Sequence, residues 1–120
     1  MKIYLATPVN GRSEKTLREK QLAAMERIDY MTEIVRGLYP DAEFINPVRK
    51  ILTYHKGLMD RESTIMGTCV QMVMDSDLVI FDDGWMESKG CRMEHFAAFT
   101  YRKKIMTFES ILLSLELSSL

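Results

Sequence analysis

Glu94 combines a reactive side chain with a position suited to chemistry. It follows Ser88-Lys89-Gly90 near the start of a helix that we predict from about Lys89 to Arg102. The N-terminal end of a helix carries partial positive charge, which should hold a nearby carboxylate ionised. An ionised carboxylate beside a ligand crevice can attack a sugar carbon as a nucleophile. A glutamate that only stabilises its own helix would look the same, and composition alone favours that simpler interpretation.

A turn that could bind an anion joins the first predicted strand to the first predicted helix. It reads Thr7-Pro8-Val9-Asn10-Gly11-Arg12. Backbone N–H groups and the helix dipole at such a turn favour a negatively charged ligand, and Asn10, Gly11 and Arg12 would add a permissive backbone and a guanidinium. The turn is neither a Walker motif nor G-x-G-x-x-G, so an ordinary strand-to-helix connection explains it equally well.

Two acids and a tryptophan follow the most apolar predicted strand. We expect Asp82 and Asp83 to face the mouth of a crevice, where they could bind sugar hydroxyls or a metal. Acids before a glycine are at least as typical of a plain turn. Trp85 could stack on a base or cover the edge of the sheet.

No metal centre or known hydrolytic triad is predicted. Cys91 and His95 lie four residues apart on one predicted helix, but two ligands do not make a zinc site and no third Cys or His cluster accompanies them. His55 stands alone in a polar segment. A Ser-His-Asp or Cys-His arrangement has no local support.

Alternating strands and helices must position these residues. Short apolar runs predict strands, and apolar residues at three- and four-residue steps predict helices. The predicted strands cover residues 2–6, 42–46, 77–81 and 105–108. The predicted helices cover residues 13–36, 63–75 and 89–102, with a loop at 48–62 and a packing helix at 109–120.

The first of these helices has recognisable ends and one apolar face. Ser13 is its predicted N-cap, with Glu14 in the first turn, and Gly37 is its predicted stop. The apolar face is a stripe of residues along one side of the helix. Its members are Leu17, Ala24, Ile28, Met31 and Val35.

The alternation predicts a single α/β domain over residues 1–120, with a parallel sheet of four to five strands, right-handed crossovers and helices on both faces. The continuous apolar run at 77–81 is typical of a strand covered on both sides. In such sheets ligands bind outside the carboxyl ends of the strands, where the strand order reverses. The loops at 7–12, 47–57 and 82–90 are therefore the predicted ligand-binding loops.

Composition narrows the class of partner. Apolar residues make up 47% of the chain, enough for one core. Sixteen basic residues balance 17 acidic ones, which argues against binding to a nucleic-acid polymer through its phosphates. No run is long enough for a signal peptide or a membrane span. Cys69 and Cys91 are too few for a disulfide framework, so we expect a cytoplasmic protein with reduced thiols.

Three segments carry a resemblance to a known family. They are Met1-Lys2-Ile3-Tyr4-Leu5-Ala6-Thr7-Pro8, Asp77-Leu78-Val79-Ile80, and Gly84-Trp85-Met86-Glu87-Ser88-Lys89-Gly90-Cys91-Arg92-Met93-Glu94. Together they resemble the nucleoside 2-deoxyribosyltransferase family over roughly residues 1–106. The chain is most similar to an uncharacterised bacterial and phage branch with a Gly-Trp…Ser-x-Gly…Glu signature.

The resemblance implies a flavodoxin-like, doubly wound sheet and a two-step reaction. Glu94 would attack the anomeric carbon of a deoxyribosyl group, and Tyr4 would orient it. The base would leave, and a second base or water would then attack the glycosyl-enzyme. No metal or organic cofactor is expected. The expected substrate-binding residues are Thr7, Pro8, Asn10, Gly11, Arg12, Asp82, Trp85, Ser88 and Gly90.

Two departures from the family pattern qualify this expectation. Where the transferases carry an Asp that contacts the base, this chain has Ser88. In the nucleotide-hydrolase branch a Ser at that place contacts the 5′-phosphate, which together with Arg12 favours a phosphorylated substrate. Both branches also carry an Asp on the helix before the "SD" strand, and counting back from Asp77 gives Cys69, with Gln71 nearby. Loss of this acid would impair protonation of the leaving base, and Asp60 or Glu62 could replace it only through the loop.

The expected function is therefore cleavage or transfer at the N-glycosidic bond of a (deoxy)nucleoside or nucleoside 5′-monophosphate. The alternative is a non-catalytic nucleotide- or nucleoside-binding module on the same fold. A receiver domain would need acids directly after the first strand, where this chain has Thr7-Pro8, and a flavin carrier would need a Ser/Thr-rich first loop. The leucine-rich tail at 109–120 predicts packing on the domain or on a partner subunit, and hence a homodimer or larger homo-oligomer.

Overall fold

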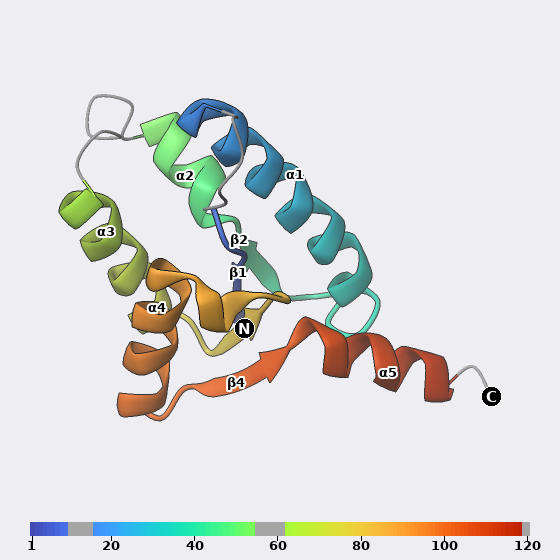
Figure 1. Cartoon of the computed structure of the whole chain (residues 1–120). Coiled ribbons are helices and arrows are strands. Elements are labelled where there is room, and N and C mark those ends of the chain that lie inside the picture. Colours follow the sequence, from blue (N-terminus) through green and yellow to red (C-terminus); the bar gives the residue numbers. More distant parts are fainter. Residues whose placement is uncertain (10–15, 55–61, 119–120) are drawn as a thin grey trace.

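The computed structural model describes residues 1–9, 16–54 and 62–118. Within these ranges five α-helices surround one sheet (Figure 1). In chain order the elements are β1 (Lys2–Ala6), α1 (Leu17–Arg36), β2 (Glu43–Ile45), α2 (Pro47–Tyr54), α3 (Glu62–Met74), β3 (Leu78–Phe81), the 3₁₀ helix η2 (Trp85–Glu87), α4 (Lys89–Thr100), β4 (Lys104–Thr107) and α5 (Phe108–Ser118).

The sheet has four parallel strands in the order β2-β1-β3-β4. In register, Tyr4 on β1 lies opposite Ile45 on β2 and Val79 on β3. The chain goes outward from β1 to β2 and then returns to place β3 on the other side of β1. The order therefore reverses between β1 and β3, and the predicted flavodoxin-like, doubly wound fold is confirmed. The reversal marks the carboxyl ends of these two strands as the place where a ligand is expected.

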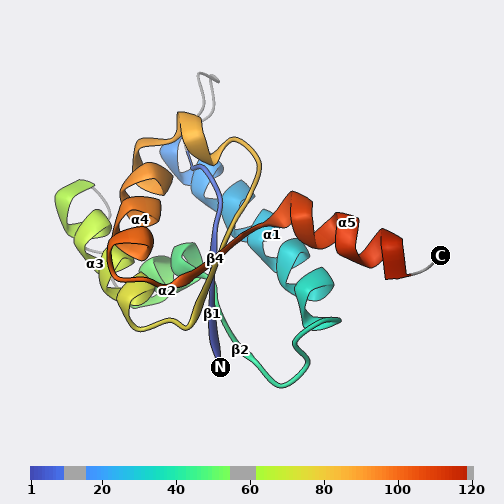
Figure 2. The same cartoon turned by 90° about the horizontal axis from the view of Figure 1, so that it is seen from below.

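Helices cover both faces of the sheet (Figure 2). On one face, Ile3 and Leu5 of β1 pack against the apolar stripe of α1 from Ala24 to Val35 and against Phe108 and Ile111 of α5. Leu17, predicted to belong to that stripe, is exposed at the first turn of α1. On the other face, the alternate β1 residue Tyr4 belongs to a cluster with Val73 at the end of α3 and with residues of α4. Because side chains alternate across a strand, β1 and β3 are buried on both sides.

The first helix begins later than predicted. Its N-cap is Thr16, whose hydroxyl accepts a hydrogen bond from the Glu19 backbone N–H at 3.2 Å. The predicted cap Ser13 and the residues around it lie outside the described ranges. The predicted stop at Gly37 is correct, although its φ of −61° is right-handed, so the position does not depend on glycine's conformational freedom.

The prediction of a loop at residues 48–62 is wrong for its first part, because α2 occupies Pro47–Tyr54. Pro47 stands at the first helical position, where its fixed φ suits a helix and its missing N–H does no harm. The Asn46 side chain caps the helix by accepting from the Arg49 N–H at 3.1 Å. Val48 and Ile51, three residues apart, are buried. The asparagine-proline pair and this spacing were the local signals for a helix.

The tail forms α5, as predicted for residues 109–120, with its bounds shifted to Phe108–Ser118. Phe108 and Ile111 are buried against the sheet, whereas Leu113 and Leu117 are exposed. In both views α5 extends away from the body of the molecule (Figures 1 and 2). Among the described helices, none is both long and apolar enough to cross a membrane.

Candidate functional site

A cavity of about 550 Å³ lies at the carboxyl end of β1, within the range typical of ligand sites. Its walls come from the end of β1, the first turns of α1, the helices α2 and α3, and the start of α4. Tyr4 and Glu94 both line it. The predicted crevice at the reversal of strand order is therefore a real cavity in the fold.

Tyr4 and Glu94 form a buried hydrogen-bonded pair in this cavity. The Tyr4 hydroxyl donates to Oε2 of Glu94, although the two residues are 90 positions apart in the chain. Side chains alternate between the two faces of a strand. Ile3 and Leu5 point to the α1 face of the sheet, so Tyr4 between them points to the α3–α4 face. Glu94 lies on the second turn of α4, on the face that also buries Cys91 and Ala98. The sheet and the helix thus bring the two predicted catalytic residues together.

Burial changes the electrostatics expected for Glu94. The pKa of its carboxyl group is raised to about 7 by burial, and the hydrogen bond from Tyr4 offsets only part of that effect. The expectation that the helix N-terminus would hold this carboxylate ionised is wrong, because Glu94 lies beyond the first turn, where the dipole is weaker. Near neutral pH the group is divided between its protonated and ionised forms.

Two thiols complete the surroundings of Glu94. Cys69 on α3 and Cys91 on α4 both line the cavity and are free cysteines. Burial raises the pKa of each thiol to about 12, with the Glu94 charge as a further cause, so both stay protonated at neutral pH. Cys69 interacts with the Tyr4 hydroxyl and is the residue that the sequence count places where the resembled family has an acid.

The neighbouring candidate, Gln71, does not face the cavity. Its amide donates to Asp75 at 3.2 Å on the exposed side of α3. Asp60 and the Glu62 side chain lie outside what the structure describes. Cys69 is therefore the α3 side chain that meets the Tyr4–Glu94 pair.

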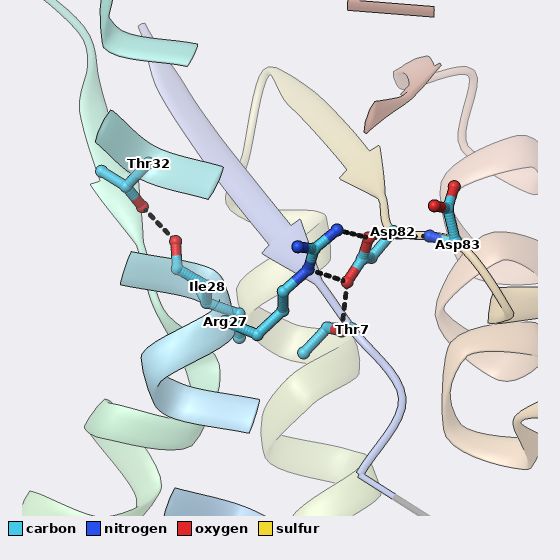
Figure 3. Close-up of polar contacts among 6 residues, drawn as sticks. All are labelled: Thr7, Arg27, Ile28, Thr32, Asp82 and Asp83. Atoms are coloured by element: carbon cyan, nitrogen blue, oxygen red, sulfur yellow. Dashed lines mark hydrogen bonds and ion pairs between the residues drawn. The ribbon is translucent and has the colours of Figure 1, made fainter. Parts of the chain in front are cut away.

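Asp82 holds the ends of two strands together and does not face the cavity as predicted. Its carboxylate accepts from Arg27 Nε at 2.9 Å and Nη2 at 3.0 Å, and from the Thr7 hydroxyl at 2.7 Å (Figure 3). It also accepts from the Asp83 backbone N–H at 2.8 Å. These bonds hold the Asp82 pKa below its usual value despite burial. Asp82 is not among the cavity-lining residues, so a role in binding sugar hydroxyls is not supported.

Sequence reasoning missed Arg27, which sits on α1 and crosses the end of β1 to reach Asp82 (Figure 3). Its guanidinium also lies 5.2 Å from the ring centre of Tyr30 and 5.3 Å from that of Phe108. A single arginine on a helix gives no local signal, because its partner is 55 residues away. The ion pair fixes α1 against the strand ends beside the cavity.

Trp85 is likewise placed away from the cavity lining. Its ring stacks on His95 with centroids 4.2 Å apart and planes 16° apart, and it lies 5.4 Å from the Phe81 ring. The alternative interpretation, in which Trp85 covers the sheet, fits this position better than stacking on a base. The His95 ring is packed between Trp85 and Phe81, with 5.2 Å between the His95 and Phe81 ring centroids. Among the described residues, no group of three or more His, Cys, Asp and Glu side chains could hold a metal.

The remaining predicted residues divide into three groups. Thr7, Ser88 and Gly90 line the cavity. Ser88 is the N-cap of α4, and its buried side chain accepts from the Cys91 N–H at 3.2 Å. Pro8 lies beside Gly84 and not in the lining, whereas Asn10, Gly11 and Arg12 fall outside the described residues.

Gln21 is a second residue that sequence reasoning missed. It lies on α1, lines the cavity and is 8% exposed. The sequence contained a signal for this residue. Between Leu17 and Ala24, the helical spacing of the apolar stripe places an apolar residue at position 21, and the chain has Gln21 there.

Chemically, the site joins a carboxyl group that can ionise near neutral pH, a tyrosine that orients it, and a largely apolar cavity. Comparison with known families assigns no activity to this arrangement. A family model described as a domain of unknown function, DUF4406, matches residues 1–107, and the chain belongs to that family. No curated protein and no solved structure matches the chain.

Proposed function

We propose that this protein cleaves or transfers at the N-glycosidic bond of a (deoxy)nucleoside or nucleoside 5′-monophosphate, with Glu94 as the nucleophile. The observation that carries the proposal is the buried Tyr4–Glu94 hydrogen bond inside the cavity at the carboxyl end of β1. A carboxylate held by a single tyrosine keeps its second oxygen available for attack. The resemblance to the nucleoside 2-deoxyribosyltransferases, drawn from the sequence, points to the same two residues.

The proposed reaction has two displacements. In the first, a Glu94 oxygen forms a bond to the anomeric carbon while the C–N bond to the base breaks. The base leaves with that electron pair and takes up a proton from solvent. In the second, water or another base attacks the same carbon and releases a proton, and the Glu94 carboxylate is restored. The proton taken up by the leaving base in the first step is balanced by the proton released in the second.

Tyr4 positions the nucleophile and does not supply the proton. Burial and the neighbouring Glu94 raise the pKa of the Tyr4 hydroxyl well above its usual value, so it keeps its proton. Its hydrogen bond stabilises the ionised carboxylate relative to the protonated form. Because attack requires the ionised form, activity should rise with pH as Glu94 loses its proton around pH 7.

Ser88 and Lys89 support a phosphorylated substrate as the preferred one. Both line the cavity at the start of α4, where backbone N–H groups and the helix dipole favour an anion. Arg12, in the loop after β1, is proposed from the sequence to contact the same phosphate. Arg12→Ala and Lys89→Ala should each reduce the preference for a 5′-monophosphate over the matching nucleoside, measured as a ratio of kcat/KM values.

The decisive experiment incubates the purified protein with deoxynucleosides and their 5′-monophosphates, with and without an acceptor base, and follows free base by chromatography. Glu94→Gln keeps the size and the hydrogen-bond acceptor for Tyr4 but removes the nucleophile, and it should abolish base release. Glu87→Gln is the matched control, since it makes the same change at an exposed position in η2. Intact-mass analysis after rapid denaturation should detect a glycosyl adduct on the wild type and not on Glu94→Gln.

Base release that survives in Glu94→Gln would refute the nucleophile assignment. Base release from no substrate in the panel would refute the enzymatic proposal as a whole. The ratio of hydrolysis to transfer comes from the same chromatograms, with and without the acceptor base.

Cys69 favours a second candidate, a non-catalytic nucleoside- or nucleotide-binding module. Its thiol keeps its proton at neutral pH because of the raised pKa and is a weak acid at the place where the resembled family has a carboxyl group. A module of this kind would bind the same ligands in a thermal-shift assay and release no base. Cys69→Asp is the discriminating variant, because it should create or strengthen base release if the thiol is what limits the chemistry.

We also propose that the protein is a cytoplasmic homo-oligomer. Exposed Leu113 and Leu117 on the projecting α5 support a contact between subunits, and the free thiols of Cys69 and Cys91 suit a reducing compartment. Light scattering on the purified protein tests the first statement. A monodisperse monomer at micromolar concentration would refute it.

A further inference from the structure

Gln21 occupies a position that the pattern of α1 reserves for an apolar residue. It lies in the stripe of α1 that contains Ala24, Ile28, Met31 and Val35, all of which are buried. The residue is 8% exposed, and no hydrogen bond joins its amide to any residue in the described parts of the chain. A buried amide without partners is unfavourable unless something else supplies them.

The amide is open to the cavity. Among the described residues, no side-chain nitrogen or oxygen that is fully enclosed lacks a hydrogen-bond partner. The unpartnered Gln21 amide is therefore accessible to solvent, and the residue lines the cavity. The lining hydroxyls of Tyr4, Thr7 and Ser88 are already engaged in hydrogen bonds within the protein.

We propose that Gln21 recognises the base of the substrate by pairing with an edge that carries a hydrogen-bond donor next to an acceptor. A primary amide presents a carbonyl oxygen and an NH₂ group side by side, which is the complement of such an edge. Adenine, cytosine, uracil and hypoxanthine all have one. Because the amide can rotate by half a turn, Gln21 requires the pair and accepts either order of donor and acceptor.

The positions of Gln21 and Glu94 suit a nucleoside whose base contacts Gln21 and whose sugar contacts Glu94. Gln21 approaches from α1, on one face of the sheet, and Glu94 approaches from α4, on the other. A ligand between them can place its base against α1 and its sugar against the carboxyl group. The apolar lining residues Val48 and Ile51 of α2 offer surface for the flat faces of a base.

The inference rests on the proposed function for the identity of the ligand, but free bases test it without any chemistry. The dissociation constants of adenine, cytosine, uracil and hypoxanthine are measured by calorimetry, with benzimidazole as a ligand of purine shape that lacks the paired edge. Gln21→Leu should weaken the tightest of the four bases by about 10- to 100-fold, the effect of losing one bidentate pair. It should change benzimidazole affinity by less than about twofold.

Matched variants keep the result interpretable. Gln71→Leu makes the same change on the exposed side of α3 and should leave every affinity unchanged. Gln21→Met is a second apolar replacement of similar length, and an apolar residue suits the α1 stripe, so both variants should fold. An equal loss of affinity for adenine and for benzimidazole in folded Gln21→Leu would overturn the proposal, because it would show that the substitution changed only the shape of the cavity. Unchanged affinities, or no binding of any base to the wild type, would overturn it as well.

The two proposals fail in different ways. Base binding that depends on Gln21, with no base release from any nucleoside, would refute the enzymatic proposal and leave this one standing. Base release that depends on Glu94, with the KM for nucleosides unchanged in Gln21→Leu, would do the reverse.

Discussion

Neutralising Glu94 should make the protein more stable at alkaline pH. In the folded state the pKa of this buried carboxyl group is about 7, whereas its ordinary value is 4.5. Between these values the folded state holds a proton that the unfolded chain has lost, so raising the pH through this window removes stability. The contribution is fully present below about pH 4.5 and fully lost above about pH 7. At about 1.4 kcal/mol per pKa unit, the interval corresponds to about 3 kcal/mol.

Glu94→Gln removes this penalty, because an amide stays neutral at every pH and can still accept the hydrogen bond from Tyr4. We expect the free energies of unfolding of the variant and the wild type to be similar at pH 5. At pH 9 the variant should be more stable by about 3 kcal/mol. With a urea dependence of about 1–3 kcal/mol per molar, that difference moves the midpoint of unfolding by roughly 1–3 M.

Urea denaturation of both proteins at pH 5 and pH 9 provides the measurement, and all other titrating groups cancel in the comparison. Glu87→Gln, at an exposed position, is the control and should show the same small difference at both pH values. A difference between Glu94→Gln and the wild type that does not change with pH would refute the reasoning. It would mean that the ionised carboxylate is solvated or paired with a cation in the folded protein.

Three further expectations follow from the same contacts. Tyr4→Phe removes the hydrogen bond that favours the ionised Glu94, so the acidic limb of any pH–rate profile should move to higher pH; an unmoved limb would contradict this. Asp82→Ala leaves the Arg27 guanidinium without its carboxylate partner and should lower the free energy of unfolding by about 2 kcal/mol in a urea titration, whereas a loss below about 0.5 kcal/mol would show that the ion pair contributes little. Gly84 has a φ of +81° with room for a methyl group, so Gly84→Ala should cost about 1 kcal/mol through backbone strain alone, and no loss of thermal stability would contradict that account.

Local sequence patterns were sufficient for most of the fold. The continuous apolar run at 78–81 required a strand covered on both faces, and its parallel neighbours followed from the alternation of strands with helices. The exception was α2, where an asparagine cap and Pro47 marked a helix start that the polar character of the segment concealed. Even there the signal was local and could have been used.

Local patterns also identified Glu94 as a candidate, but not its chemical state. The sequence suggested a carboxylate stabilised by a helix end, whereas enclosure by β1, α3 and α4 raises its pKa. Burial depends on segments far apart in the chain, and desolvation of a carboxyl group outweighs a helix dipole beyond the first turn. For the same reason no local pattern could show that Tyr4 donates to Glu94 across 90 residues.

Asp82, Trp85 and Gln21 show the same division between sequence and structure. The sequence placed Asp82 and Trp85 at the right end of β3, because residues that follow a parallel strand must lie at its carboxyl edge. Only the tertiary structure decided that Arg27 forms an ion pair with Asp82 and that His95 stacks on Trp85. It also decided that Gln21 lines the cavity. The sequence by itself determined the order and type of the elements, since these depend on short-range periodicity and turn chemistry. Which polar groups pair with each other and which remain open to a ligand was decided by the packing of distant segments, because hydrogen bonds and burial depend on proximity in space.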